Sequence, residues 1–219
     1  MQLIGMLDSP YVRRVAVSLQ LLGLPFEHRS ISVFRDFEAF RRLNPVVKAP
    51  TLVCDDGTVL MDSGLIIDHA ESIAAPGRSL MPAAPEARLL ALRRIGLALA
   101  ACEKAVQIVY EGMVRPPEKR HEPWLERVRG QLAAAWSLLE AEAEADRPPL
   151  LPGGARIDQA GISVAVTWQF TQHLLPGLVD PARHPALRDF SAAAERLPAF
   201  LAAPHGSATY RAGAAAPAA

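Results

Sequence analysis

A proline-rich stretch from residue 76 to residue 85 separates two parts of the chain that have different hydrophobic patterns. Before this stretch, short apolar runs alternate with segments of helical period, which is typical of strands covered by helices. After it, the strand signals stop and long helical patterns follow. The sequence therefore predicts an α/β domain over residues 1–80 and an all-helical domain over residues 86–211.

The N-terminal part is expected to contain, in order, a strand, a helix, a strand, a helix, two strands and a helix. Ser9 and Pro10 suit the N-cap and the first turn of a helix. Gly23 and Pro25 would end that helix. The other elements are strands at 2–6 and 26–31, a helix at 36–43, a hairpin of strands at 51–54 and 58–61, and a helix from 63 to about 73.

The C-terminal part is expected to be helical throughout. The predicted helices cover about 86–114, 124–145 and 158–175, with shorter pieces from residue 185 onward. Within the second of these, an apolar stripe recurs at helical spacing, formed by Leu125, Val128, Leu132, Ala135 and Leu139. The tail at 212–219, AGAAAPAA, has almost nothing to pack with and is expected to be disordered.

Charge and cysteine content narrow the classes of partner. The 23 basic residues equal the 23 acidic ones, so no overall field would draw the chain to nucleic acid or to an anionic membrane. The longest uncharged run, between Asp158 and Asp180, includes glutamine, histidine and proline, which favours a buried helix over a membrane span. Cys54 and Cys102 are far apart and form no metal-ligand grouping, which favours a reducing cytoplasm and no metal.

Three local motifs follow one another in the N-terminal part. They are SPYVRR at 9–14, NPVVKAPTL at 44–52, and the pair Asp62 and Ser63 at the start of a helix. Together they resemble the glutathione transferases over nearly the whole chain. The resemblance implies a thioredoxin-like N-terminal domain, an all-helical C-terminal domain, glutathione as co-substrate without a metal, and a cytoplasmic homodimer.

Ser9 is the catalytic residue that the resemblance implies, because serine-type members hydrogen-bond the glutathione sulfur with a residue at this place. A free thiol has a pKa of about 8.5 and is mostly protonated at neutral pH. A hydroxyl donor at a helix N-terminus would favour the thiolate. The alternative is that Ser9 only caps its own helix.

Residues around Pro50 are expected to hold the middle of glutathione. By resemblance Pro50 follows a cis peptide bond, although the sequence itself does not show the isomer. Ala49 could then pair with the cysteinyl backbone as an added strand would. Lys48 could meet a glutathione carboxylate, or it could be an ordinary surface lysine.

Asp62 and Ser63 match the two charges at the γ-glutamyl end of glutathione. The Asp62 carboxylate can receive the ammonium group. The Ser63 hydroxyl and the N–H groups of the helix that it opens can bind the carboxylate. The alternative is that one of the two residues is a simple N-cap.

The hydrophobic second substrate is expected between the loop after the first strand and the long helix of the C-terminal domain. The candidate contacts are Met6, Leu7, Val106, Tyr110 and Met113, all of which could equally belong to a core. Of the paired arginines Arg13 and Arg14, at least one is expected to point away from the core.

The function that follows is attack of glutathione thiolate on a small hydrophobic electrophile. The same thiolate could serve an isomerase, a dehalogenase or a peroxidase, and the fold could also belong to a non-catalytic binding or stress protein. The sequence does not separate these alternatives, because the second-substrate pocket uses residue types that any helical core shares.

Overall fold

The computed structural model describes residues 1–145 and 157–210, so the predicted disordered tail at 212–219 lies outside the described residues. Contacts divide the chain into two units. One consists of Met1–Leu80 together with the chain from Glu195, and the other is Met81–Ala194. The contacts therefore group the C-terminal segment with the N-terminal unit, and the boundary at residues 80 and 86 stays a prediction.

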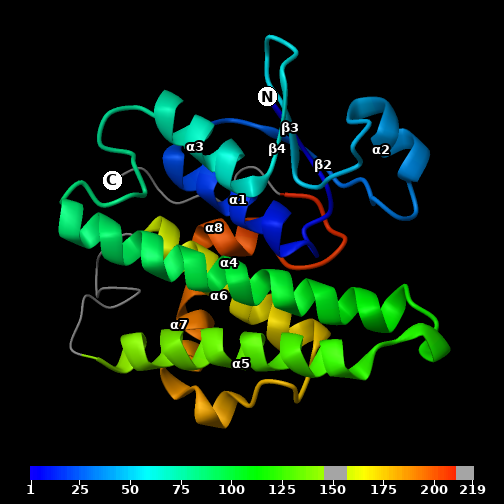
Figure 1. Ribbon diagram of the computed structural model, residues 1–219. Helices are drawn as coiled ribbons and strands as arrows, with labels where there is room; N and C mark the ends of the chain where they lie inside the picture. Colours follow the sequence, from blue (N-terminus) through cyan, green and yellow to red (C-terminus); the bar gives the residue numbers. More distant parts are fainter. Residues whose placement is uncertain (146–156, 211–219) are drawn as a thin grey trace. The chain divides into compact units, whose positions relative to one another are not determined.

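A four-stranded mixed sheet lies at the centre of the N-terminal unit (Figure 1). Its strands, in spatial order, are β2 (Glu27–Arg29), β1 (Gln2–Ile4), β3 (Thr51–Val53) and β4 (Val59–Met61). β1 is parallel to β2 and antiparallel to β3, and β3 and β4 form an antiparallel hairpin. The predicted order of strands and helices is confirmed, and each strand is only three residues long.

The helices of this unit are α1 (Pro10–Leu22), α2 (Phe37–Leu43), α3 (Ser63–Ile73) and α8 (Pro198–Ala202). The ends of α1 are defined by the residues that the sequence indicates. Ser9 is its N-cap, and Gly23 ends it with a positive φ of 76°. The Gly23 N–H donates to the carbonyls of Gln20 and Leu19. The core around α1 consists of buried apolar side chains from α1, β1, β3 and α3.

Both arginines of the first motif are buried, against the prediction that at least one points to solvent. Arg13 donates two hydrogen bonds to the Glu195 carboxylate at 2.6 and 2.7 Å, and its Nε donates to the Ala203 carbonyl at 2.8 Å. Its guanidinium also lies 5.5 Å from the centre of the Phe200 ring. A buried guanidinium needs such partners, and here they come from the far end of the chain.

The second unit is all-helical, with α4 (Pro85–Met113), α5 (Glu122–Glu144), α6 (Gln159–Leu174) and α7 (Pro185–Ala194). Two short 3-10 helices, η1 (Pro117–Lys119) and η2 (Pro181–Arg183), lie in the connections. α4 and α5 pack along each other (Figure 1). The predicted apolar stripe of α5 faces the core, where Trp136 meets Trp168 edge to face at 5.0 Å. The fold class predicted from the sequence is thus confirmed.

α6 is buried along most of its length, as its uncharged sequence indicates. Asp158 caps it by accepting a hydrogen bond from the Gly161 N–H at 2.7 Å. Burial raises the pKa of Asp158, while its hydrogen bonds and the charge of Arg94 act in the opposite direction. Within 1–145 and 157–210, no helix has the length and apolarity needed to cross a bilayer.

Candidate functional site

The register of the sheet brings the three motifs to one end of it. Ile4 of β1 lies opposite Thr51 of β3, and Thr51 lies opposite Met61 of β4. The chain therefore leaves β1, enters β3 and leaves β4 at the same end of the sheet. Ser9 follows the first of these points, Ala49–Pro50 precedes the second, and Asp62–Ser63 follows the third.

Gly5 shows how closely two of these segments approach each other. Its φ is +133°, a conformation that L side chains rarely adopt. A Cβ added here would lie 2.6 Å from Val12 Cγ2 and 3.1 Å from the Ala49 Cβ. The chain between β1 and Ser9 is thus packed directly against Ala49, which only a glycine at position 5 permits.

Ser9 is half-buried at the N-terminus of α1. Its Oγ accepts a long hydrogen bond, 3.4 Å, from the Val12 N–H, and its own N–H donates to the Met6 carbonyl at 3.2 Å. Within the described residues the Ser9 hydroxyl donates to no protein group. Capping of α1 by Ser9 is therefore real, and it leaves the hydroxyl hydrogen able to reach a ligand.

The Ala49–Pro50 peptide bond is cis, as the resemblance implies. The segment before it is held by side chains, since Asn44 Nδ2 donates to Thr51 Oγ1 at 2.8 Å and Thr51 Oγ1 donates to the Lys48 carbonyl at 2.7 Å. In the part of the chain that is described, the N–H and C=O of Ala49 have no hydrogen-bond partner. Ala49 itself is half-buried. An extended peptide could pair with both groups.

Asp62 and Ser63 form the start of α3. The Asp62 Oδ1 accepts a hydrogen bond from the Gly64 N–H at 2.8 Å, so Asp62 is the N-cap. Its Oδ2 lies 3.8 Å from Lys48 Nζ, and both side chains are about half exposed. Two residues that were predicted separately as ligand contacts therefore form a weak ion pair with each other.

Arg14 joins this site, although the sequence argument did not include it. Its Nη1 donates to the Ser63 Oγ at 2.9 Å, and both residues are buried. With Oγ accepting from arginine, the Ser63 hydroxyl can direct its own hydrogen outward. No pattern near Arg14 in the sequence indicates this contact, because Ser63 lies 49 residues away.

The loop before Ser9 carries both an acid and an apolar side chain. Burial raises the pKa of Asp8, while the charge of Arg35 and nearby backbone N–H groups act in the opposite direction. Arg35 also donates to the Met6 sulfur at 3.4 Å, and Met6 is half-buried. Leu7 has no exposed surface, so its side chain offers a substrate nothing to touch. This argues against Leu7 as a substrate contact.

The other predicted substrate contacts lie on α4. Val106 packs against the core of the helical unit, whereas Tyr110 and Met113 are exposed. Their role towards a second substrate stays a prediction. Among the described residues, no group of three or more histidine, cysteine, aspartate or glutamate side chains could hold a metal ion.

Two family models match the chain. The glutathione S-transferase N-terminal domain matches residues 3–78, and the glutathione S-transferase C-terminal domain matches residues 122–193. A crystal structure of a glutathione transferase family member from Pseudomonas fluorescens Pf-5 with bound glutathione is 31% identical. The alignment covers 92% of this chain and 97% of that one, with a TM-score of 0.79. This chain belongs to the glutathione S-transferase family.

Two further relatives agree with this family assignment. A glutathione S-transferase from Methylobacterium radiotolerans, solved in complex with glutathione sulfonate, is 28% identical with a TM-score of 0.82, covering 91% of this chain and 92% of that chain. The uncharacterized GST-like protein YibF of Escherichia coli is 28% identical over 141 residues, which are 64% of this chain and 68% of YibF. The relatives therefore share both the fold and the family of this chain.

Proposed function

We propose that this protein binds glutathione at the end of the sheet where the three motifs meet, and activates its thiol as a thiolate that attacks a hydrophobic electrophile. The observation that carries this proposal is the convergence of two helix N-termini, those of α1 and α3, on the same end of the sheet as the unpaired Ala49 peptide groups. A helix N-terminus stabilises anions, and this ligand brings a thiolate and a carboxylate to them.

The sulfur binds at the N-terminus of α1. The Ser9 hydroxyl donates a hydrogen bond to it, and the positive end of the helix dipole favours the anion. Both effects lower the pKa of the thiol towards neutrality. The sulfur then forms a bond to carbon. In a displacement the leaving group departs with its bonding electrons, and in an addition the resulting carbanion takes up a proton.

The rest of glutathione extends along the end of the sheet. Its cysteinyl backbone pairs with the free N–H and C=O of Ala49 next to Pro50, as a short added strand. Its γ-glutamyl ammonium binds the Asp62 carboxylate, and its γ-glutamyl carboxylate binds the Ser63 hydroxyl and the first N–H groups of α3. Arg14, behind Ser63, adds a positive charge to this carboxylate site. Lys48 contacts a glutathione carboxylate from the exposed side.

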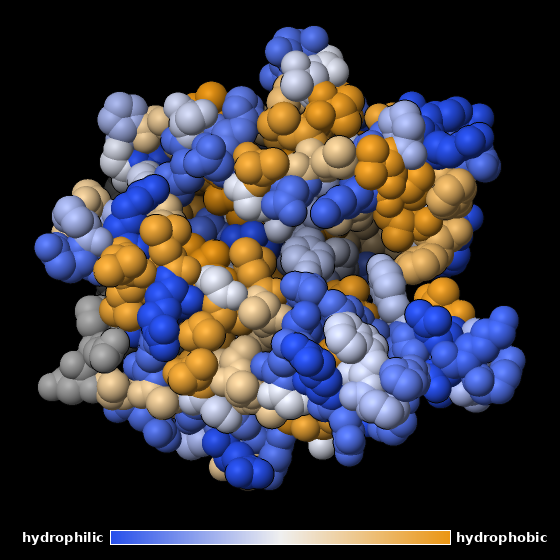
Figure 2. All heavy atoms as spheres, viewed as in Figure 1, coloured by the Kyte–Doolittle hydropathy of each residue, from blue (hydrophilic) through white to orange (hydrophobic). Residues whose placement is uncertain are grey.

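The electrophile binds on apolar side chains, for which Met6, Val106, Tyr110 and Met113 are the remaining candidates. Figure 2 shows apolar side chains on the viewed face of α4, and the exposed residues of this helix include Leu89 and Leu92. Exposed apolar surface of this kind supports a homodimer. Neither Cys54 nor Cys102 forms a disulfide within the described residues, which supports a reducing cytoplasm.

The proposal is tested by glutathione titration calorimetry together with the pH dependence of conjugation to 1-chloro-2,4-dinitrobenzene. Ser9→Ala should keep glutathione affinity within about threefold and move the apparent thiol pKa up towards about 8.5. Asp62→Ala should weaken glutathione binding at least tenfold without moving that pKa. Absence of binding at millimolar glutathione contradicts the whole proposal.

An unchanged thiol pKa in Ser9→Ala, with binding intact, contradicts the catalytic part alone. The protein would then be a glutathione-binding module. Analysis of the products separates conjugation from isomerisation, dehalogenation and peroxide reduction, because only conjugation leaves the sulfur attached to the substrate carbon.

A further inference from the structure

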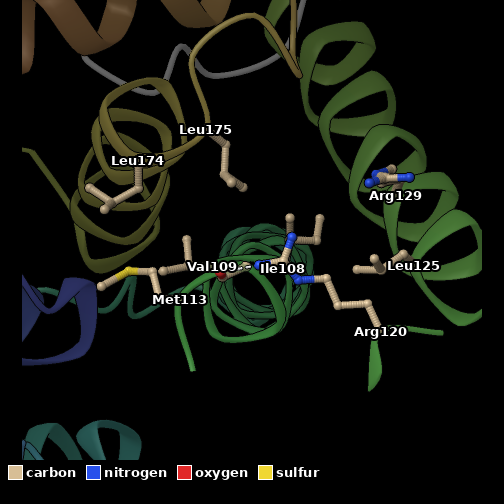
Figure 3. A pocket seen from close by; sticks show the side chains of 9 residues that line it. Ile108, Val109, Met113, Arg120, Leu125, Arg129, Leu174 and Leu175 are labelled. Atoms are coloured by element: carbon tan, nitrogen blue, oxygen red, sulfur yellow. Dashed lines mark hydrogen bonds between the residues drawn. The ribbon is translucent and has the colours of Figure 1, made fainter. Parts of the chain in front are cut away.

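Ser9 and the chain that leads to it belong to the N-terminal unit. The other unit has a cavity of about 290 Å³, shown in Figure 3, and all the residues that line it lie between Met81 and Ala194. Within the N-terminal unit, the position of the Ser9 hydroxyl depends on the chain at 5–8 and on the residues that hold this chain.

His28 of β2 holds the first residue of that chain. Its Nε2 lies 2.7 Å from the Gly5 carbonyl oxygen, and the Gly5 N–H donates to the Arg29 carbonyl at 3.0 Å. Both backbone polar groups of Gly5 are thus bound from β2, although a glycine with a φ of +133° could otherwise rotate easily. The next carbonyl, that of Met6, accepts from the Ser9 N–H at 3.2 Å. Two hydrogen bonds therefore connect the His28 imidazole to the backbone of Ser9.

The other ring nitrogen of His28 is bound to the C-terminal segment, residues 207–210. Its Nδ1 lies 3.0 Å from the backbone nitrogen of Tyr210, whose N–H can only donate. Nδ1 is therefore the acceptor, and Nε2 carries the hydrogen that it donates to Gly5. Burial lowers the pKa of His28, while the bond to Gly5 acts in the opposite direction. The lowered pKa favours the neutral ring that this arrangement needs.

The C-terminal segment contacts the chain around β2 at three alternate residues. The Tyr210 ring stacks on Phe26 with the ring centres 4.5 Å apart, and the Ser30 Oγ donates to the Ser207 carbonyl at 3.2 Å. Phe26, His28 and Ser30 are two positions apart, which suits side chains on one side of an extended chain. The segment, drawn in red in Figure 1, thus lies along β2 and holds the imidazole in place.

We propose that His28 is a positioning residue of the sulfur site, which holds the Gly5 carbonyl and through it Ser9, and that the C-terminal segment fixes the tautomer and orientation of its ring. The effect on the thiol rests on the proposed function, whereas the coupling of His28 to Ser9 does not need glutathione. Without the imidazole, the Gly5–Met6 peptide group can turn, and the Ser9 hydroxyl loses its fixed direction towards the sulfur. The opposite tautomer would place the Nε2 lone pair against the Gly5 carbonyl oxygen, and the Tyr210 N–H excludes it.

Amide hydrogen exchange, measured by NMR in protein without glutathione, tests the coupling. His28→Leu removes both hydrogen bonds and should speed exchange of the Ser9 and Tyr210 amides about fivefold or more. His28→Gln keeps an N–H that can reach Gly5, and should return the Ser9 amide to within about twofold of wild type. His121→Leu makes the same change at an exposed histidine of the helical unit and should alter neither amide. Unchanged exchange at Ser9 in His28→Leu overturns the proposal.

The effect on the sulfur is tested by the pH dependence of thiolate absorbance in bound glutathione. His28→Leu should raise the thiol pKa and slow conjugation at about pH 6 by about threefold or more, measured at saturating glutathione. In a Ser9→Ala background the same change should not raise the pKa further, because His28 acts through Ser9. Tyr210→Pro removes the N–H and the stacked ring and should also raise the pKa. Tyr210→Phe keeps both and should leave it unchanged.

The outcomes separate this proposal from the proposed function. If the thiol pKa is the same in wild type and in Ser9→Ala, the proposed role of Ser9 fails, and exchange of the Ser9 amide alone decides the coupling. If the pKa depends on Ser9 but not on His28, or if the two changes add, the positioning role of His28 is overturned. An unchanged pKa in Tyr210→Pro overturns the role of the C-terminal segment. Far-UV circular dichroism identifies the folded variants, and the comparison is made among these.

Discussion

Replacing Arg14 with methionine should weaken glutathione binding through one chemical group of the ligand, its γ-glutamyl carboxylate. Arg14 Nη1 lies 2.9 Å from the Ser63 Oγ. A carboxylate that accepts from this hydroxyl would lie roughly 2.7 Å beyond it, so the two charges would be roughly 5 Å apart. At an effective dielectric constant of about 20 their attraction is roughly 3 kcal/mol.

This value is an upper figure, because the site also exchanges water for protein partners on binding. Hydrogen bonds that involve a charged group contribute about 1.5 to 3 kcal/mol in mutational series. Arg14→Met should therefore raise the dissociation constant for glutathione about ten- to hundredfold. Arg14→Lys, which keeps the charge, should recover part of the loss.

The assay is calorimetric titration with glutathione and with a matched tripeptide in which 4-aminobutyrate replaces the γ-glutamyl residue. That tripeptide lacks only the carboxylate in question. Wild-type protein should bind it more weakly than glutathione, and Arg14→Met should weaken it less than twofold further. In steady-state kinetics with saturating glutathione, kcat should stay within about twofold, since the sulfur site is intact.

Equal weakening of both tripeptides by Arg14→Met would refute the reasoning. Such a result means that Arg14 supports the fold of the site as a whole and does not act on the carboxylate. The melting temperature of Arg14→Met is measured alongside, because the arginine is also buried.

Three further changes test the structure around the site. Glu195→Gln leaves the buried Arg13 guanidinium without its anionic partner and should cost about 2 to 4 kcal/mol of unfolding free energy. Glu38→Gln, in the exposed pair with Arg41, should cost less than about 1 kcal/mol. Urea titration followed by far-UV circular dichroism compares the two variants. Gly5→Ala places a methyl group within 2.6 Å of a neighbouring side chain at a φ of +133°, and should lower both the melting temperature and glutathione affinity; unchanged values would contradict the close packing there. Burial raises the folded-state pKa of Asp158, so the contribution of Asp158 to stability falls as pH rises from 3.8 through that pKa. The urea midpoint of Asp158→Asn should therefore rise relative to that of wild type between pH 4 and pH 7. A constant difference between the two midpoints would contradict the raised pKa.

Features that depend on neighbouring residues were predictable from the sequence. The cap at Ser9 and the stop at Gly23 are local, since each involves residues within a few positions. The order of strands and helices follows from the change of hydrophobic period, which is also local. The convergence of the three motifs followed only from resemblance, because the register that produces it is a property of the assembled sheet.

Features that depend on distant residues were not predictable. Burial of Arg13 needs Glu195, which is 182 residues away, and no pattern near either residue indicates the other. The same holds for Arg14 and Ser63, which are 49 residues apart. A leucine at position 7 could face either a substrate or the core, so the sequence did not indicate that its side chain is buried.

The Arg13–Glu195 pair also has a consequence for the order in which this protein matures. During translation, the first eighty residues leave the ribosome well before the carboxylate that neutralises their buried guanidinium has been synthesised. The N-terminal unit is therefore complete only when the chain from Glu195 onward returns to it, after the whole intervening helical segment has emerged. A chain released from the ribosome before residue 195 would contain all three motifs. It would still lack the ion pair between Arg13 of α1 and Glu195.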